Sequence, residues 1–298
     1  MTDHPFFELE SPYRGWYRLH RLSFGSGGPV TTLVAGIHGN ECNGTYALNL
    51  LAGRLRLQPP RGTVHLVPCV NLFGAEEGRK RWPFDDRDIN EVFPGDADGS
   101  PVERVAEAVM RASEGQLCVD LQTGSAVVHE VPHVRAPLTG PVLALGQAAG
   151  LPVLWRRPAE QFDDGLLGAW RAAGRTALVL RGGRGGSLDV DDAKTMARAL
   201  VRLLAQAGHL HAPEPAPPTI VTEKMLDYRC EVGGFFVPEV RPGEPVVVGQ
   251  VLGTLRAAIG GETIESFHAT AAGVVLAVRV YPVVHGRELV VRVAQSTT

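Results

Sequence analysis

The stretch TTLVAGIHGNECNGTYAL, from Thr31 to Leu48, decides how this chain is expected to fold. Its first part, Thr31 to Ile37, is β-branched and aliphatic and carries no charge, which predicts a buried strand. Gly36 and Gly39 allow the backbone to turn a corner, and an apolar helical pattern resumes at Asn43. A strand that passes through a glycine corner into a helix is typical of an α/β fold.

His38 and Glu41 lie on that corner, three residues apart. Open α/β sheets bind their ligands just outside the carboxyl ends of the strands, which is where this pair would lie. A histidine nitrogen and a carboxylate oxygen are both ligands of Zn²⁺. His38 and Glu41 are therefore the first candidate metal ligands.

Strands and helices alternate up to about residue 210, which predicts a mainly parallel sheet with helices on both faces. We expect residues 1–210 to form this α/β domain, residues 211–218 a Pro-rich linker, and residues 219–298, with their short Val-rich runs, a β-barrel. The other expected strands are Tyr17–Phe24, Val64–Cys69, Leu117–Leu121 and Thr176–Leu180, and the helices are Asn43–Arg56, Pro101–Ser113, Gly140–Ala149 and Leu188–Gly208.

Several segments along the chain, HGNE included, share a pattern with one known family. The chain resembles the succinylglutamate desuccinylase/aspartoacylase family, relatives of the zinc carboxypeptidases. The segments that carry the resemblance are HGNE with Gly44, Asn71–Gly74 with Arg81, Asp88–Gly95, Asp120–Ser125, Pro132–Ala136 and the glycine run after Leu180. The resemblance implies a zinc-carboxypeptidase-like domain with one Zn²⁺ per chain that cleaves the amide bond of N-acyl amino acids.

The C-terminal part resembles the barrel-sandwich fold of biotinyl and lipoyl domains, which raises a carrier function. No lysine follows Lys224, so no attachment residue is present on any turn of the barrel. The family resemblance instead implies a cap over the zinc domain.

The third zinc ligand of the family is a histidine in a D-L-H segment, and Gln122 stands at that position. An amide oxygen is a weak neutral donor, so the replacement should cost a zinc site much of its affinity. His129 and His133 follow closely, and His133 is the candidate substitute ligand, although ordinary surface or substrate-pocket polarity is the favoured explanation of both.

The family's catalytic glutamate is the second departure. Leu180 occupies that position in the best register, and a shift by one residue would place Arg181 there. General acid–base help is typically worth about 10²–10⁴ in rate, and neither side chain can supply it. An acid from elsewhere, such as Glu130 or Glu160, would have to take over.

The substrate-binding arginine of the family's D-L-N-R segment is the third departure. Asn90 remains as a candidate catalytic residue, but Glu91 reverses the charge beside it, which predicts neutral or cationic substrates. Arg81 matches the family's other arginine and could polarise a carbonyl or bind an anion.

Composition restricts the partners. A net charge of -3 gives no electrostatic case for binding nucleic acid or a membrane. The acidic N-terminus is unlike a signal peptide, and four unpaired cysteines suit a reducing cytoplasm. We expect a small-molecule substrate or ligand as the partner; a homo-oligomer stays open.

Two functions remain. The first is a metal-dependent hydrolase of a small amide or ester, with zinc on His38 and Glu41 and an altered third ligand and base. The second is a non-catalytic binding or regulatory protein that retains the fold.

Overall fold

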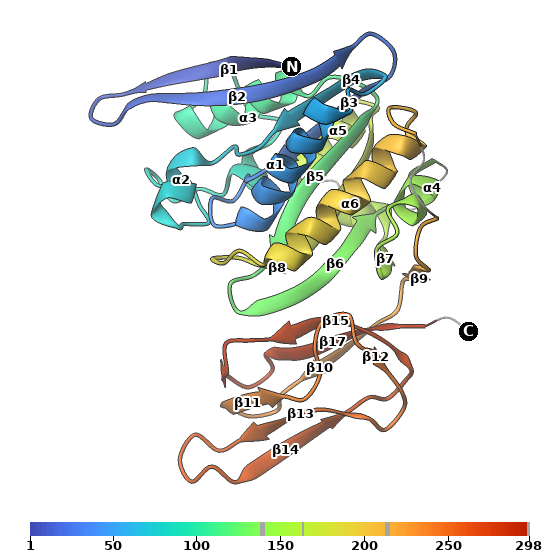
Figure 1. Cartoon of the computed structure of the whole chain (residues 1–298). Helices are drawn as coiled ribbons and strands as arrows, with labels where there is room; N and C mark the ends of the chain where they lie inside the picture. The colour runs from blue at the N-terminus through green and yellow to red at the C-terminus, as the bar shows by residue number, and fades with distance from the viewer. Residues whose placement is uncertain (138–140, 163, 212–214, 297–298) are drawn as a thin grey trace.

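A computed structural model describes residues 1–137, 141–162, 164–211 and 215–296. Four parallel strands form its centre: β3 (Val30–Ala35), β4 (Gly62–Val67), β5 (Leu117–Gly124) and β8 (Thr176–Arg184). In the sheet they lie in the order β4-β3-β5-β8. The carboxyl ends of β3, β5 and β8 therefore meet at one edge (Figure 1). His38 follows β3, and Gln122 and Arg181 lie near the ends of β5 and β8.

Antiparallel strands extend this centre on both sides. The hairpin of β1 (Thr2–Ser11) and β2 (Gly15–Ser26) adds to β4, and β6 (Val128–Ala136) runs antiparallel to β8. The α/β class is confirmed, but the sheet is mixed, so the prediction of a mainly parallel sheet is wrong. The sequence pattern missed β1 and β6, and both form antiparallel pairs.

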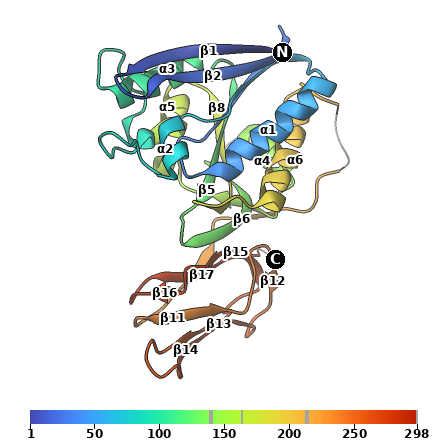
Figure 2. The same ribbon diagram turned by 60° about the vertical axis from the view of Figure 1, so that its left-hand side comes forward.

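Helices cover both faces of the sheet (Figure 2). On one face α1 (Cys42–Leu57), α4 (Pro141–Ala148) and α6 (Val190–Gln206) pack their leucines into a core with Leu121 and Leu180. On the other face α3 (Pro101–Ala112) and α5 (Gly165–Ala172) pack with Val34, Cys118 and Val179, next to α2 (Leu72–Glu77). The remaining elements of this part are the short helices η1 (Ile89–Val92) and η2 (Ala159–Phe162) and the strand β7 (Val153–Arg156).

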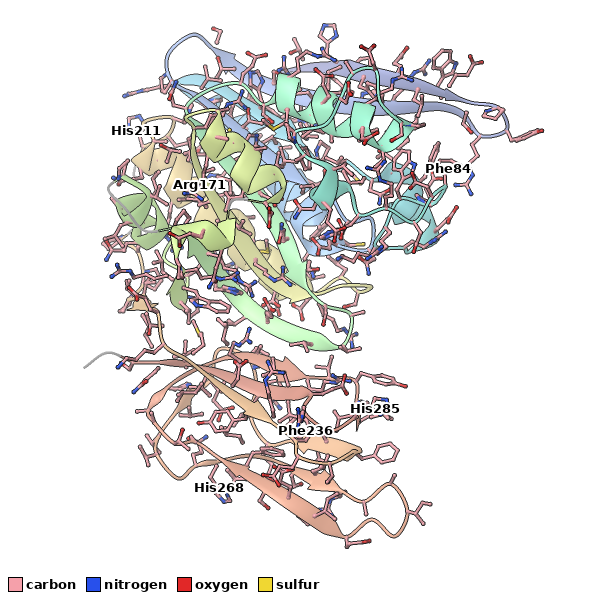
Figure 3. All side chains as sticks on the ribbon, turned by 180° about the vertical axis from the view of Figure 1, so that it is seen from behind. Phe84, Arg171, His211, Phe236, His268 and His285 are labelled. Carbon is pink, nitrogen blue, oxygen red and sulfur yellow. The ribbon has the colours of Figure 1, made fainter. Side chains whose placement is uncertain are left out.

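The C-terminal part is all β and surrounds its own core. Phe236 and Phe267 pack edge to face at 5.8 Å in that core, and Figure 3 labels Phe236 between the strands. Its strands are β9 (Ile220–Thr222), β10 (Met225–Arg229), β11 (Gly234–Pro238), β12 (Pro245–Val246), β13 (Val251–Arg256), β14 (Thr263–His268), β15 (Gly273–Arg279), β16 (Val283–Val284) and β17 (Leu289–Gln295).

These strands are not isolated from the α/β part. β15 pairs with β6, so that β15, β17 and β10 continue the large sheet, while β14, β13, β11 and β16 form a second sheet of four strands. The barrel-sandwich cap and the boundaries at 210 and 219 stay predictions. Gly140 of the expected helix and residues 212–214 of the expected linker lie outside the described residues.

Within the described ranges, no helix combines the length and the apolar character that a membrane crossing requires.

Candidate functional site

The corner between β3 and α1 brings His38 and Glu41 together. Gly36 has a φ of +66°, and a Cβ there would lie 2.9 Å from Cys69 Cα. A Cβ on Gly39 would lie 2.2 Å from the backbone carbon of Gly74, so the loops can approach only because this residue has no side chain. The tight corner directs both side chains to one place, where His38 Nδ1 lies 2.9 Å from Glu41 Oε1.

Asp88 holds the other side of the imidazole. His38 Nε2 lies 2.9 Å from Asp88 Oδ1, and Lys80 Nζ donates to the second oxygen of Asp88 at 2.8 Å. The backbone N–H of Asn90 also donates to Asp88, at 3.0 Å. His38, Glu41 and Asp88 are buried, so they form a fixed chain of charges that ends at the exposed side chain of Lys80.

This chain sets the charge of the imidazole. Burial lowers the pKa of His38, but the hydrogen bonds to Asp88 and Glu41 outweigh burial and raise it to about 9. Burial raises the pKa of Asp88, but the contacts with His38 and then Lys80 hold it well below its usual range. At neutral pH without a metal, His38 is therefore a cation between two carboxylates.

Gln122 lies on β5 beside Arg181 of β8. The Gln122 amide donates from Nε2 to Asp120 Oδ2 at 2.6 Å, and its oxygen accepts from Arg181 Nη1 at 3.1 Å. The amide that replaces the family's histidine thus links a buried carboxylate to a guanidinium.

Arg181, not Leu180, reaches the site from β8. Leu180 is fully buried in the core beneath α1 and α6, on the opposite face of the sheet from Val179. The prediction that Leu180 faces the site is wrong because alternate residues of a strand point to opposite faces. The register pairs Gln122 with Arg181, the alternative that follows from a shift by one.

Glu130 lies between two arginines. Its Oε2 accepts from Arg181 Nε at 2.8 Å and from Arg135 Nη2 at 3.0 Å. Burial raises the pKa of Glu130, but the charges of Arg135 and Arg181 lower it to about 2. A carboxylate held so firmly as an anion is a poor proton acceptor, so Glu130 does not replace the lost base.

His133, the candidate substitute ligand, is enclosed by its neighbours on β6. The ring is fully buried, Nδ1 donates to the Val131 carbonyl at 2.8 Å, and Nε2 accepts from Arg135 Nε at 2.8 Å. Burial and the charge of Arg135 lower the pKa of His133 to about 3, so it is neutral. Both nitrogens of His133 are engaged inside β6, so a role as the substitute metal ligand stays a prediction.

Asn90 and Arg81 lie at the edge of the site. Asn90 Oδ1 accepts from the backbone N–H of Leu166 at 3.1 Å, which fixes the start of α5 and gives Asn90 a structural task. Arg81 is exposed and donates to the Asp86 carbonyl at 2.9 Å. Arg81 and Glu91 line a surface recess that also reaches Asp88. A role for Arg81 in binding substrate stays a prediction.

Two buried carboxylate oxygens beside His38 have no partner among the described residues: Glu41 Oε2 and Asp120 Oδ1. Burial and then the charge of Glu41 raise the pKa of Asp120 to about 7. Unpaired buried carboxylate oxygens are costly unless a cation or a proton satisfies them.

Asp88, Lys80 and Asp120 were not predicted as site residues. Asp88 and Asp120 belong to the family-like segments, so their sequence positions carried a signal, whereas Lys80 carried none.

A second group, His129, Asp189 and Asp192, brings its ligand atoms within 4.8 Å of one another. Its members already satisfy one another: His129 Nε2 lies 2.6 Å from Asp192 Oδ2, and Asp189 caps α6 by accepting from the Asp192 N–H at 3.1 Å.

Residues 27–207 match the family model described as the succinylglutamate desuccinylase/aspartoacylase catalytic domain. The chain belongs to the succinylglutamate desuccinylase/aspartoacylase family. The resemblance inferred from the motifs is confirmed, and the family is typically metal-dependent.

Several relatives of known name share the fold or the sequence. An N-alpha-acetyl-L-2,4-diaminobutyric acid deacetylase of Halomonas elongata is 29% identical over 242 residues, 76% of this chain and 70% of that protein. The product-bound ectoine utilization protein EutE (DoeB) of Ruegeria pomeroyi matches with a TM-score of 0.80 at 21% identity, over 97% of this chain and 93% of that one. A family member from Rhodobacter sphaeroides gives 0.80 at 22% identity, over 97% and 94%. Both solved structures support the fold.

Proposed function

We propose that this protein is a metal-dependent hydrolase that removes the acyl group from a small N-acyl amino acid. The observation that carries the proposal is the pairing of His38 Nδ1 with Glu41 Oε1 at the carboxyl end of β3, next to an unpaired buried oxygen of Glu41. The deacetylase activity named for the Halomonas relative supports the reaction class.

The residues at this corner fit a divalent metal. The imidazole nitrogen and the carboxylate oxygen lie 2.9 Å apart. The nitrogen is a borderline donor and the oxygen a hard donor, and both suit Zn²⁺. Asp88 on the far nitrogen of His38 is the outer carboxylate that commonly orients a histidine ligand. His38 and Glu41 would hold the metal, which would displace the proton on Nδ1.

Gln122 is a poor third ligand in this arrangement. Its amide oxygen accepts from Arg181 at 3.1 Å, and a fixed guanidinium charge opposes a divalent cation on the same oxygen. A site with two protein ligands leaves the other positions open to water and substrate.

A bound metal would polarise the acyl carbonyl and lower the pKa of water. The residues of this chain would do the rest. Asp88 holds the imidazole of His38 in one orientation, and Lys80 balances the charge of Asp88. Asp120 has an unpaired oxygen and a pKa near neutrality, which suits a carboxyl group that accepts and returns a proton.

One observation favours the alternative, a non-catalytic binding protein. Arg181 stands beside Gln122, so the third ligand of the family is replaced by an amide that is already hydrogen-bonded to a cation. A descendant that binds an amino acid without hydrolysing it could keep such a site.

Metal analysis together with an amine-release assay tests the proposal. We expect the protein to carry close to one zinc per chain, to release free amine from N-acetyl amino acids, and to lose both metal and activity in His38→Ala. The matched control is His211→Ala, which removes an exposed histidine and should keep both. Trace metal in the wild type would refute the metal site. One bound metal without turnover of any N-acetyl amino acid would favour the non-catalytic alternative.

A further inference from the structure

Arg181 is held rigidly by two of its three nitrogens. Nε donates to Glu130 and Nη1 donates to Gln122, at 2.8 and 3.1 Å. Nη2 has no hydrogen-bond partner within residues 1–137, 141–162, 164–211 and 215–296, and it is not among the fully buried unpaired atoms. A guanidinium has five donors, so the end of the fork keeps free N–H groups that solvent or a ligand can reach.

Among the described residues, the two guanidinium groups on this side of the site are hydrogen-bonded to a single carboxylate. Glu130 is the one carboxylate that Arg135 and Arg181 share, and the imidazole between them, His133, is neutral. Arg135 is committed to the protein, because it donates to Glu130 and His133 and stacks on Trp155 at 4.7 Å. Arg181 is therefore the arginine of this pair that can meet a ligand.

A ligand bound to Arg181 would lie next to the corner that carries His38 and Glu41. Gln122 connects the Arg181 guanidinium to Asp120. The charges of Glu41 and Asp120 also act on Arg181 and help to raise its pKa, against the lowering by burial. A substrate whose amide group lies at His38 and Glu41 would thus have the Arg181 guanidinium on the side of β8.

We infer that Arg181 binds the carboxylate of the substrate, so that this protein acts on N-acyl amino acids with a free α-carboxylate and discriminates against their uncharged amides. The inference rests on the proposed function. A planar guanidinium with free end-on N–H groups matches the two oxygens of a carboxylate. Glu91, which favoured neutral or cationic substrates, is exposed in the recess with Arg81, and Arg181 is not among the residues that line that recess.

The experiment compares a free acid with its amide on the zinc-loaded protein. The two substrates are N-acetyl-L-2,4-diaminobutyrate and its α-carboxamide. Their turnover is measured as the release of free amine. The affinity for the products, L-2,4-diaminobutyrate and its α-carboxamide, is measured by titration calorimetry. We expect the wild type to favour the acid about 10- to 100-fold in kcat/KM and in affinity, as for a hydrogen bond to a charged group. Arg181→Met should abolish the preference.

Two further variants make the result specific. Arg198→Met removes an exposed arginine of α6 that contacts Thr195, and we expect it to keep the full preference. Arg181→Lys keeps the charge without the planar fork, and we expect an intermediate preference. The melting temperature of each variant separates a loss of folding from a loss of recognition, and Glu130 keeps Arg135 as its partner in all of them.

The outcomes separate this inference from the proposed function. Turnover of acid and amide at equal rates, or an unchanged preference in Arg181→Met, would overturn the role of Arg181 while the hydrolase stands. Preferential binding of the free acid that Arg181→Met abolishes, without any turnover, would support the carboxylate site and overturn the hydrolase. Neither binding nor turnover of any of the four compounds would overturn both.

Discussion

Replacing Asp88 by Asn should change the pH dependence of stability in the metal-free protein. Asp88 accepts from His38, from Lys80 and from a backbone N–H. With Glu41 it raises the pKa of buried His38 from 6.5 to about 9. A shift of this size corresponds to about 3 kcal/mol of unfolding free energy. Because the folded pKa is raised, that stability is fully present below about pH 6.5 and is lost as the pH rises through about 9.

Asp88→Asn should lower the free energy of unfolding by about 1–2 kcal/mol near pH 6, which is the part that Asp88 contributes. The rest should remain, because Glu41 still contacts the ring. Near pH 10 the variant should cost much less, because His38 is neutral there in both proteins. The contact with the half-exposed Lys80 contributes little. Urea unfolding with a chelator at about pH 6 and 10 measures the two differences.

A matched control is Asp86→Asn, which removes an exposed carboxylate of the same loop that contacts Arg79 at 3.0 Å. We expect the control to cost under about 0.5 kcal/mol at either pH. An equal cost of Asp88→Asn at both pH values would refute the coupling between Asp88 and His38.

Three other substitutions test the geometry. Gly39→Ala should destabilise the protein by more than about 3 kcal/mol in thermal unfolding, because its Cβ would meet Gly74 backbone at 2.2 Å, whereas Gly53→Ala in α1 meets open space and should be neutral or stabilising. Leu180→Glu would bury an unpaired carboxylate in the core and should leave little folded protein in the soluble fraction, whatever metal is added. Gln122→His should raise zinc occupancy in metal analysis by supplying an imidazole; unchanged occupancy would argue against a metal next to β5.

Local signals account for what could be predicted. The apolar run before His38 and the glycines after it lie within a few residues, so the strand, the corner and the His38–Glu41 pair follow from neighbouring residues. The family-like segments supplied Gln122 as the third position. These features need no knowledge of distant contacts.

The rest depends on contacts between distant parts of the chain. The partner of His38 lies 50 residues away in Asp88. Whether Leu180 or Arg181 faces the site depends on the register of β8 against β5, where a slip of one residue exchanges the two faces. The burial of His133 follows from its place in β6, an antiparallel strand that the alternation of strands and helices did not predict.

The pairing of β15 with β6 has a consequence for solubility. Val128, His129 and Glu130 form their ladder with Arg279, Val278 and Ala277. A chain cut before β9 would leave this half of β6 as an open edge, with backbone N–H and C=O groups ready to pair with any other strand. Strand β15 of the C-terminal part thus covers this edge of β6. Removing the last eighty residues should promote self-association through Val128, His129 and Glu130, which pair with β15 in the intact chain.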